Sequence, residues 1–121
     1  MSKSKKLIVT LAENSNNDVS TVAFTVANAA ITKGLDVGIF LTSDAVELSR
    51  EGSSEYTHVQ PFKKLSELIE NFTTNGGTLW ACAPCFNHHG LNTDETVDGT
   101  IVTGAGPMLD WVVEGAQTLS F

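Results

Sequence analysis

The chain has 121 residues, 41% of them hydrophobic, so it is long enough to bury one ordinary core and short enough to form one domain. Its 14 acidic and 7 basic residues give a formal net charge of −7, and such an acidic surface repels nucleic-acid backbones and anionic membranes. No apolar run approaches the roughly 20 residues that a membrane-spanning helix needs, so we expect a cytoplasmic protein with no nucleic-acid or membrane partner.

The first part of the chain pairs a strand-like pattern with a helix-like one. A nearly continuous apolar run at 6–12 predicts a strand buried on both faces, as in a parallel sheet. The helix that follows is expected to be capped by Asp18 or Ser20 and to end at Gly34. Phe24 lies off the main apolar stripe of this helix, which suggests a second buried side such as a subunit contact would provide.

The rest of the chain continues this alternation. The expected elements are a strand at 35–42, a short helix at 43–51, an amphipathic helix carrying Leu65, Leu68, Ile69 and Phe72, strands at 78–82 and 100–105, a helix at 106–117 and an edge strand at 118–121. Strands that alternate with helices indicate an α/β fold with right-handed crossovers and a mainly parallel sheet of four to five strands. The sequence has no internal repeat or linker, so residues 1–121 are expected to form a single domain.

The segment CAPCFNHHG at 82–90 gathers the most reactive side chains of the sequence. Both cysteines of the chain lie in it, so they supply local chemistry and not a disulfide between distant segments. Cys82 is expected to end a strand beside the N-cap of a short helix, where the positive helix end favours a thiolate. Cys85 lies about one turn further on, and His88 or His89 adds positive charge when protonated.

The position of this segment supports a functional interpretation, because ligands bind at the carboxyl ends of strands in open parallel sheets. The segments expected to share that edge with 82–90 are 13–18, 42–44 and 103–107. The glycine-containing turn at 103–107 lacks the GxGxxG and Walker patterns, so we expect neither a nucleotide site nor a resident cofactor. Glu47, by contrast, is assigned to a solvated surface.

The residues alone leave three kinds of chemistry open. The thiols suit inert packing at a strand end. They also suit a small metal- or ligand-binding module, whose ligands would be Cys82, Cys85 and His88 or His89. A CxxC pair is, thirdly, typical of a thiol-redox protein that forms a reversible disulfide.

Two longer pieces, GLDVGIFLTSDAVEL at 34–48 and LWACAPCFNHHGL at 79–91, resemble the DsrE/DsrF-like (DsrEFH) family, as do the terminal LSF and the order of the elements. The resemblance covers nearly the whole chain, and the block from Cys82 to Gly90 is its most specific part. It implies a three-layer α/β sandwich of the flavodoxin-like type, assembled as a homotrimer or a homohexamer.

The resemblance also implies a function. In sulfur-relay members of the family, the strand-end cysteine accepts sulfane sulfur as a persulfide, and the matching position here is Cys82. Cys85 matches a cysteine that only some relatives carry, and we expect it to resolve the persulfide. His88 and His89 stand where relay members have basic residues before Gly90, and they are expected to tune the thiolate. The chain is therefore expected to act as a sulfurtransferase between sulfur-donor and sulfur-acceptor proteins, and not as a classical turnover enzyme.

Overall fold

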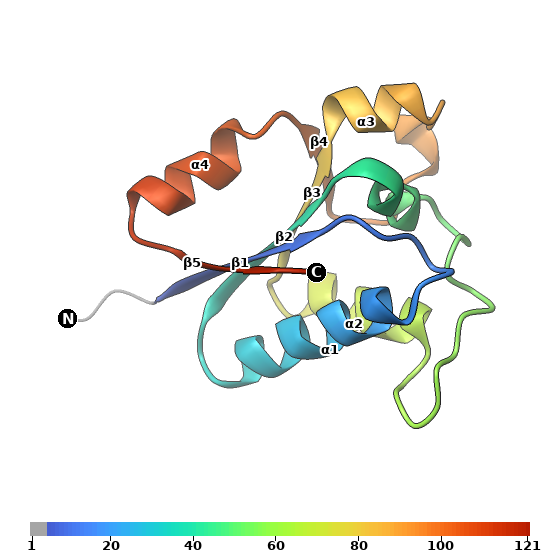
Figure 1. Ribbon diagram of the computed structural model, residues 1–121, viewed down its shortest axis with the longest axis horizontal. Coiled ribbons are helices and arrows are strands. Elements are labelled where there is room, and N and C mark those ends of the chain that lie inside the picture. The colour runs from blue at the N-terminus through green and yellow to red at the C-terminus, as the bar shows by residue number, and fades with distance from the viewer. Residues whose placement is uncertain (1–4) are drawn as a thin grey trace.

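Five parallel strands form one sheet in the structure, a computed structural model that describes residues 5–121 (Figure 1). In chain order the strands are β1 (Lys6–Leu11), β2 (Asp36–Leu41), β3 (Thr78–Cys82), β4 (Thr100–Thr103) and β5 (Gln117–Ser120). Their spatial order is β4-β3-β2-β1-β5. The helical elements are α1 (Asp18–Thr32), η1 (Ser43–Ser49), α2 (Leu65–Thr74), α3 (Ala83–His88), η2 (Thr93–Glu95) and α4 (Gly106–Val113). The predicted α/β fold with a parallel sheet is confirmed.

Both faces of the sheet are covered, which explains why the central strands read as nearly continuous apolar runs. On one face, side chains such as Val9 and Ile39 pack with α1 and α2 into the main core. On the other face, Ile8, Phe40 and Trp80 form a second, smaller cluster against α4. Figure 1 shows α1 and α2 below the sheet and α4 above it, so the molecule has three layers.

Phe24 belongs to the main core of the chain itself. Its side chain has no exposed area, and its ring meets the edge of Phe72 at a centroid distance of 5.9 Å and an interplanar angle of 85°. The predicted second buried side of this helix is confirmed, since α1 packs against β1 and β2 on one side and against α2 on another. Helix α2, and not another subunit, covers Phe24.

Several element boundaries differ from those expected. Asn17, and not Asp18 or Ser20, caps α1, because its side chain accepts a hydrogen bond from the N–H of Val19 at 2.9 Å. The segment after β2 forms the 3₁₀ turns of η1 and not an α-helix. Helix α4 ends at Val113, since Gly115 adopts a φ of 97° that an L-residue avoids. The chain then joins β5 one residue earlier than expected.

The carboxyl ends of β1, β2, β3 and β4 meet at one edge of the sheet, because all four strands run parallel. This edge carries η1 after β2 and α3 after β3, and these two elements contact each other. Among the described helices, none combines the length and the apolar character that crossing a bilayer requires.

Candidate functional site

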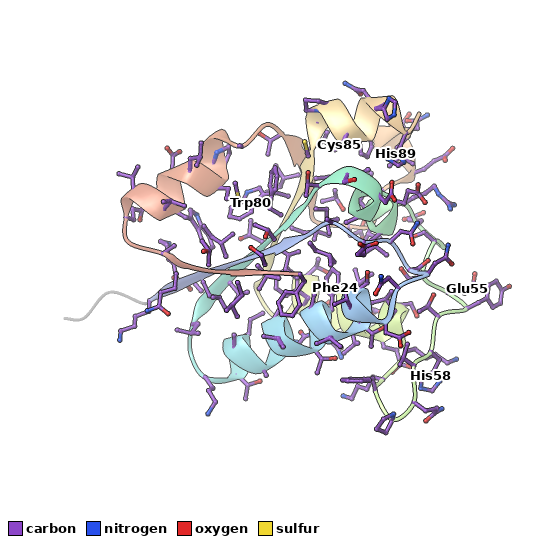
Figure 2. The ribbon with its side chains drawn as sticks, in the orientation of Figure 1. Phe24, Glu55, His58, Trp80, Cys85 and His89 are labelled. Atoms are coloured by element: carbon purple, nitrogen blue, oxygen red, sulfur yellow. The ribbon has the colours of Figure 1, made fainter. Side chains whose placement is uncertain are left out.

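The two cysteines lie on the first turn that follows β3. Cys82 is both the last residue of β3 and the N-cap of α3, and Pro84 occupies the first turn of that helix. Both thiols are free and half-buried. The predicted short helix is thus confirmed, and Figure 2 shows Cys85 on α3 and His89 at the carboxyl end of this helix, where it is the C-cap residue.

The start of η1 lies directly beside Cys85. Because β2 and β3 are neighbours in the sheet, the residues that follow Leu41 meet those that follow Cys82. Thr42 Oγ1 lies 3.8 Å from Cys85 Sγ, within hydrogen-bond range for a sulfur atom. The next residue, Ser43, has a φ of 53°, a left-handed conformation that is uncommon for a residue other than glycine. The prediction that 42–44 shares an edge with the cysteine segment is confirmed.

These neighbours lower the pKa of the Cys85 thiol. The largest cause is a hydrogen bond from the backbone N–H of Ser43, followed by one from the Cys82 thiol, while the Thr42 hydroxyl adds a smaller contribution. Each donor stabilises the negative sulfur, and burial of the thiol only partly opposes them. Cys85 is therefore the thiol that ionises more readily than an ordinary cysteine.

The pKa of the Cys82 thiol shifts in the opposite direction. Burial raises the pKa of its thiol, and the backbone N–H of Cys85 only partly counteracts this. The nearby Cys85 raises the pKa further, since two thiolates at one site repel each other. The pKa shift of Cys82 is thus opposite to the one expected from the helix end, because desolvation outweighs the effect of a helix of only six residues. The directions of the two pKa shifts favour Cys85 over Cys82 for the first ionisation.

His89 does not face the cysteines but joins α3 to η1. Its Nδ1 lies 2.8 Å from Glu47 Oε2 and its Nε2 lies 3.5 Å from Asp44 Oδ1. The imidazole is mostly buried, with 18% of its side chain exposed, whereas Glu47 is 40% exposed. The assignment of Glu47 to a solvated surface is thus only half right, because its carboxylate binds a residue 42 positions away.

His88 and Gly90 have simpler surroundings. His88 is exposed, and its ring meets the edge of the His89 ring at a centroid distance of 5.7 Å. Within residues 5–121, no hydrogen bond joins either histidine ring to a cysteine. Gly90 has a φ of 68°, and its N–H donates to Asn87 O at 3.0 Å, so it terminates α3 in the left-handed conformation that glycine tolerates.

The metal-ligand set suggested by the sequence is not assembled. Among the described residues, one group of three histidine, cysteine or acidic side chains brings its ligand atoms within 4.8 Å of one another, and it consists of Asp44, Glu47 and His89. Neither Cys82 nor Cys85 belongs to it. The two thiols therefore form a separate pair.

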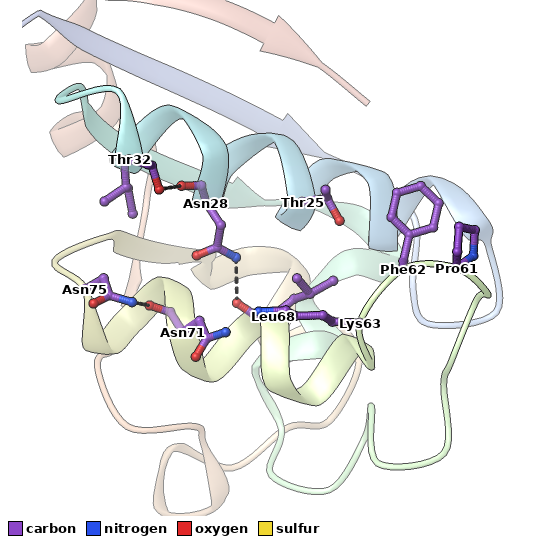
Figure 3. A pocket seen from close by; sticks show the side chains of 10 residues that line it. Thr25, Asn28, Thr32, Pro61, Phe62, Lys63, Leu68, Asn71 and Asn75 are labelled. Carbon is purple, nitrogen blue, oxygen red and sulfur yellow. Dashed lines mark hydrogen bonds between the residues drawn. The ribbon is translucent and has the colours of Figure 1, made fainter.

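A groove of about 810 Å³ opens between α1, α2 and the segment 61–63 (Figure 3). Half of its ten lining side chains carry an amide or a hydroxyl group, and Asn28 Nδ2 crosses it to donate to Leu68 O at 2.9 Å. The groove contains neither a cysteine nor a histidine. It lies on the helical layer of α1 and α2 and is not part of the cysteine site.

Comparison with known proteins places the chain in a family. The model of the DsrE/DsrF-like family matches residues 4–121. An uncharacterised protein of Methanopyrus kandleri is 27% identical over 95 residues, which are 78% of this chain and 75% of that protein. A second uncharacterised protein, from Methanocaldococcus jannaschii, is 23% identical over 105 residues, which are 87% of this chain but only 38% of that longer protein.

Solved structures share the fold over almost the full length. The YchN protein of Escherichia coli superposes with a TM-score of 0.81 and 21% identity, covering 98% of this chain and 100% of that one. A protein of unknown function from Methanobacterium thermoautotrophicum gives a TM-score of 0.74 with 14% identity and coverage of 98% and 100%. With the family match over nearly every residue, the chain belongs to the DsrE/DsrF-like family.

Proposed function

We propose that this chain carries sulfane sulfur as a persulfide on Cys82, between a sulfur-donor and a sulfur-acceptor protein of the cytoplasm. The observation that carries the proposal is the pair of free thiols at the carboxyl edge of the sheet, one of which has a lowered pKa. Family membership adds support, since sulfur transfer is the activity that the sequence resemblance implies. The pair would serve as a sulfurtransferase, with no resident cofactor.

The two thiols have complementary roles in loading. The Cys82 sulfur attacks the outer sulfur of the donor persulfide, so that a new S–S bond forms on Cys82 while the donor S–S bond breaks. The donor leaves as a thiolate, and the proton of Cys82 passes to the Cys85 thiolate that already interacts with it. The acceptor thiolate then attacks the outer sulfur, and Cys82 leaves and regains its proton.

Cys85 also limits the lifetime of the loaded state. When no acceptor arrives, the Cys85 thiol passes its proton to solvent, and the resulting thiolate attacks the inner sulfur, which is the Cys82 Sγ. A Cys82–Cys85 disulfide forms and hydrosulfide leaves, so the two cysteines are oxidised as the sulfane sulfur is reduced. The CxxC redox chemistry thus becomes the unloading step of an idle carrier.

Exposure to inorganic polysulfide, followed by intact mass spectrometry, tests this proposal. We expect one added sulfur atom (about 32 Da) on the wild-type chain, no adduct on Cys82→Ser, and a longer-lived adduct on Cys85→Ser. Wild type should also lose two hydrogens with time as sulfide is released. An adduct that survives Cys82→Ser and disappears in Cys85→Ser would overturn the assignment to Cys82, and no adduct on any variant would overturn the carrier function.

We also propose that the chain assembles with copies of itself, as a trimer or a hexamer, through α4. Met108 and Trp111 of this helix face the sheet. Leu109, Val112 and Val113 lie at i, i+3 and i+4 on another side, with exposures of 52%, 43% and 87%. A helix with apolar residues on two sides is typical of a buried helix. A second copy of the chain is the occupant that the family resemblance suggests.

Light scattering after size exclusion tests the assembly. Wild type should have a mass three or six times 12.9 kDa, and the double variant Leu109→Asp, Val113→Asp should shift toward a single chain. Tyr56→Asp is the matched control, because Tyr56 is 93% exposed in a distant loop. A wild-type mass of one chain would contradict the proposal.

A further inference from the structure

Two elements of the site, η1 and α3, contact each other at two positions, which we call levels. At the first level, the Thr42 hydroxyl at the start of η1 lies 3.8 Å from the Cys85 sulfur on α3. At the second level, Glu47 one turn further along η1 binds His89 at 2.8 Å. On α3 these two levels are one helical turn apart, since the His89 N–H donates to Cys85 O at 3.0 Å. The Cys85 thiol and the His89 imidazole are therefore held one helical turn apart.

The conformation of η1 at the first level needs other contacts to maintain it. Ser43 holds a left-handed φ of 53°, which costs a non-glycine residue free energy and persists only where surrounding contacts impose it. The Cys85 thiolate depends on this conformation, because the N–H of Ser43 is its strongest donor. The second level supplies a contact between the same two elements, with the imidazole of His89 mostly buried between Asp44 and Glu47.

We propose that His89 is a positioning residue that, through Glu47 and with help from Asp44, holds the start of η1, where Thr42 lies 3.8 Å from the sulfur of Cys85, against that sulfur. The significance of this role for sulfur transfer rests on the proposed function, but the geometry does not. No charged side chain is among the groups that shift the pKa of Cys85. His89 therefore acts by placing the backbone donor, and not by placing a charge beside the sulfur.

The test measures the pH dependence of iodoacetamide alkylation in a Cys82→Ser background, where Cys85 is the only remaining thiol of the chain. EDTA is included so that no metal ion occupies Asp44, Glu47 and His89. In this background the alkylation midpoint should lie below that of an ordinary thiol, because the largest cause of the lowered pKa of Cys85, the backbone N–H of Ser43, is retained and the serine hydroxyl can donate in place of the Cys82 thiol. His89→Ala or Glu47→Ala should move the midpoint to higher pH and slow alkylation at neutral pH about two- to five-fold, as expected when one donor to a thiolate is loosened.

Conservative and matched variants distinguish positioning from general damage. Glu47→Gln keeps an oxygen that accepts from His89, so it should retain the profile of the Cys82→Ser parent. His88→Ala removes an exposed imidazole one position earlier and should also leave the profile unchanged. The combination His89→Ala, Glu47→Ala should be no worse than either single change, because the two side chains act as one unit. Circular dichroism confirms that each variant is folded before its profile is compared.

The inference fails if folded Glu47→Ala and His89→Ala keep the parent profile, or if His88→Ala shifts it equally. It also fails if Glu47→Gln shifts the profile as much as Glu47→Ala, because the charge and not the contact would then matter. The polysulfide adduct provides a separate readout. This adduct is measured on chains that keep Cys82. The expected pH profiles with no adduct on the wild-type chain would contradict the proposed function alone, and a wild-type adduct with unaltered profiles in the His89 and Glu47 variants would contradict the positioning role alone.

Discussion

Replacing Phe72 with alanine is expected to lower the free energy of unfolding by about 3–5 kcal/mol, the range for removing a large aromatic ring from a core. The ring has no exposed area and meets Phe24 edge to face across the interface between α1 and α2. It also fills the space above Gly77, where an added Cβ would lie 2.4 Å from the ring. Truncation of Phe72 would thus leave a cavity. The backbone of Gly77 on one side and the ring of Phe24 on the other cannot close it.

Urea denaturation followed by circular dichroism measures this effect. Tyr56→Ala is the matched control, because this aromatic side chain is 93% exposed and its removal should change stability by no more than about 0.5 kcal/mol. Phe24→Ala together with Phe72→Ala should cost less than the sum of the two single changes, since both delete the same contact. A Phe72→Ala variant within about 1 kcal/mol of wild type would show that the two-helix layer is not the main core.

The fold was largely predictable because its strands are simple to recognise. Runs such as the one ending at Leu41 are apolar at nearly every position, and only a strand covered on both faces needs this. The helix wheel indicated a second buried side at Phe24, but it could not identify α2 as the element that covers it, because this contact depends on the tertiary fold. Asn17 was missed as the N-cap because three neighbouring residues, Asn17, Asp18 and Ser20, all favour that position.

The location of the site was predictable from the sequence, but the pKa shifts of its cysteines were not. The strand-to-helix junction located Cys82 and Cys85, and the parallel sheet placed Thr42 nearby. The largest cause of the lowered pKa of Cys85 is the backbone N–H of Ser43, a residue with a left-handed φ, and no local pattern in the sequence indicates either feature. The contact between Glu47 and His89 joins residues 42 positions apart, so it requires the strand order, which alternation of elements alone does not give.

The other large effect on stability is expected on the face of the sheet that α4 covers. The packing of this face depends on one position that lacks a side chain. A Cβ added to Gly38 would lie 2.3 and 2.5 Å from two atoms of the Trp80 indole and 3.3 Å from Trp111. The two indoles meet edge to face at a centroid distance of 4.9 Å, so Trp80 has little room to move. Gly38 therefore allows the close approach that packs α4 onto the sheet.

Gly38→Ala is expected to destabilise the protein by about 1–3 kcal/mol, the usual cost of forcing an extra methyl group into a packed cluster. Gly104→Ala is the control, because a Cβ there meets nothing within 4 Å and stability should stay within about 0.5 kcal/mol of wild type. Trp80→Phe in the Gly38→Ala background should recover part of the loss, since a smaller ring leaves room for the methyl group. Stability unchanged in Gly38→Ala would mean that the layer of Trp80 and Trp111 shifts freely. That would weaken the case for a fixed site, because Trp80 precedes Cys82 by only two residues on β3.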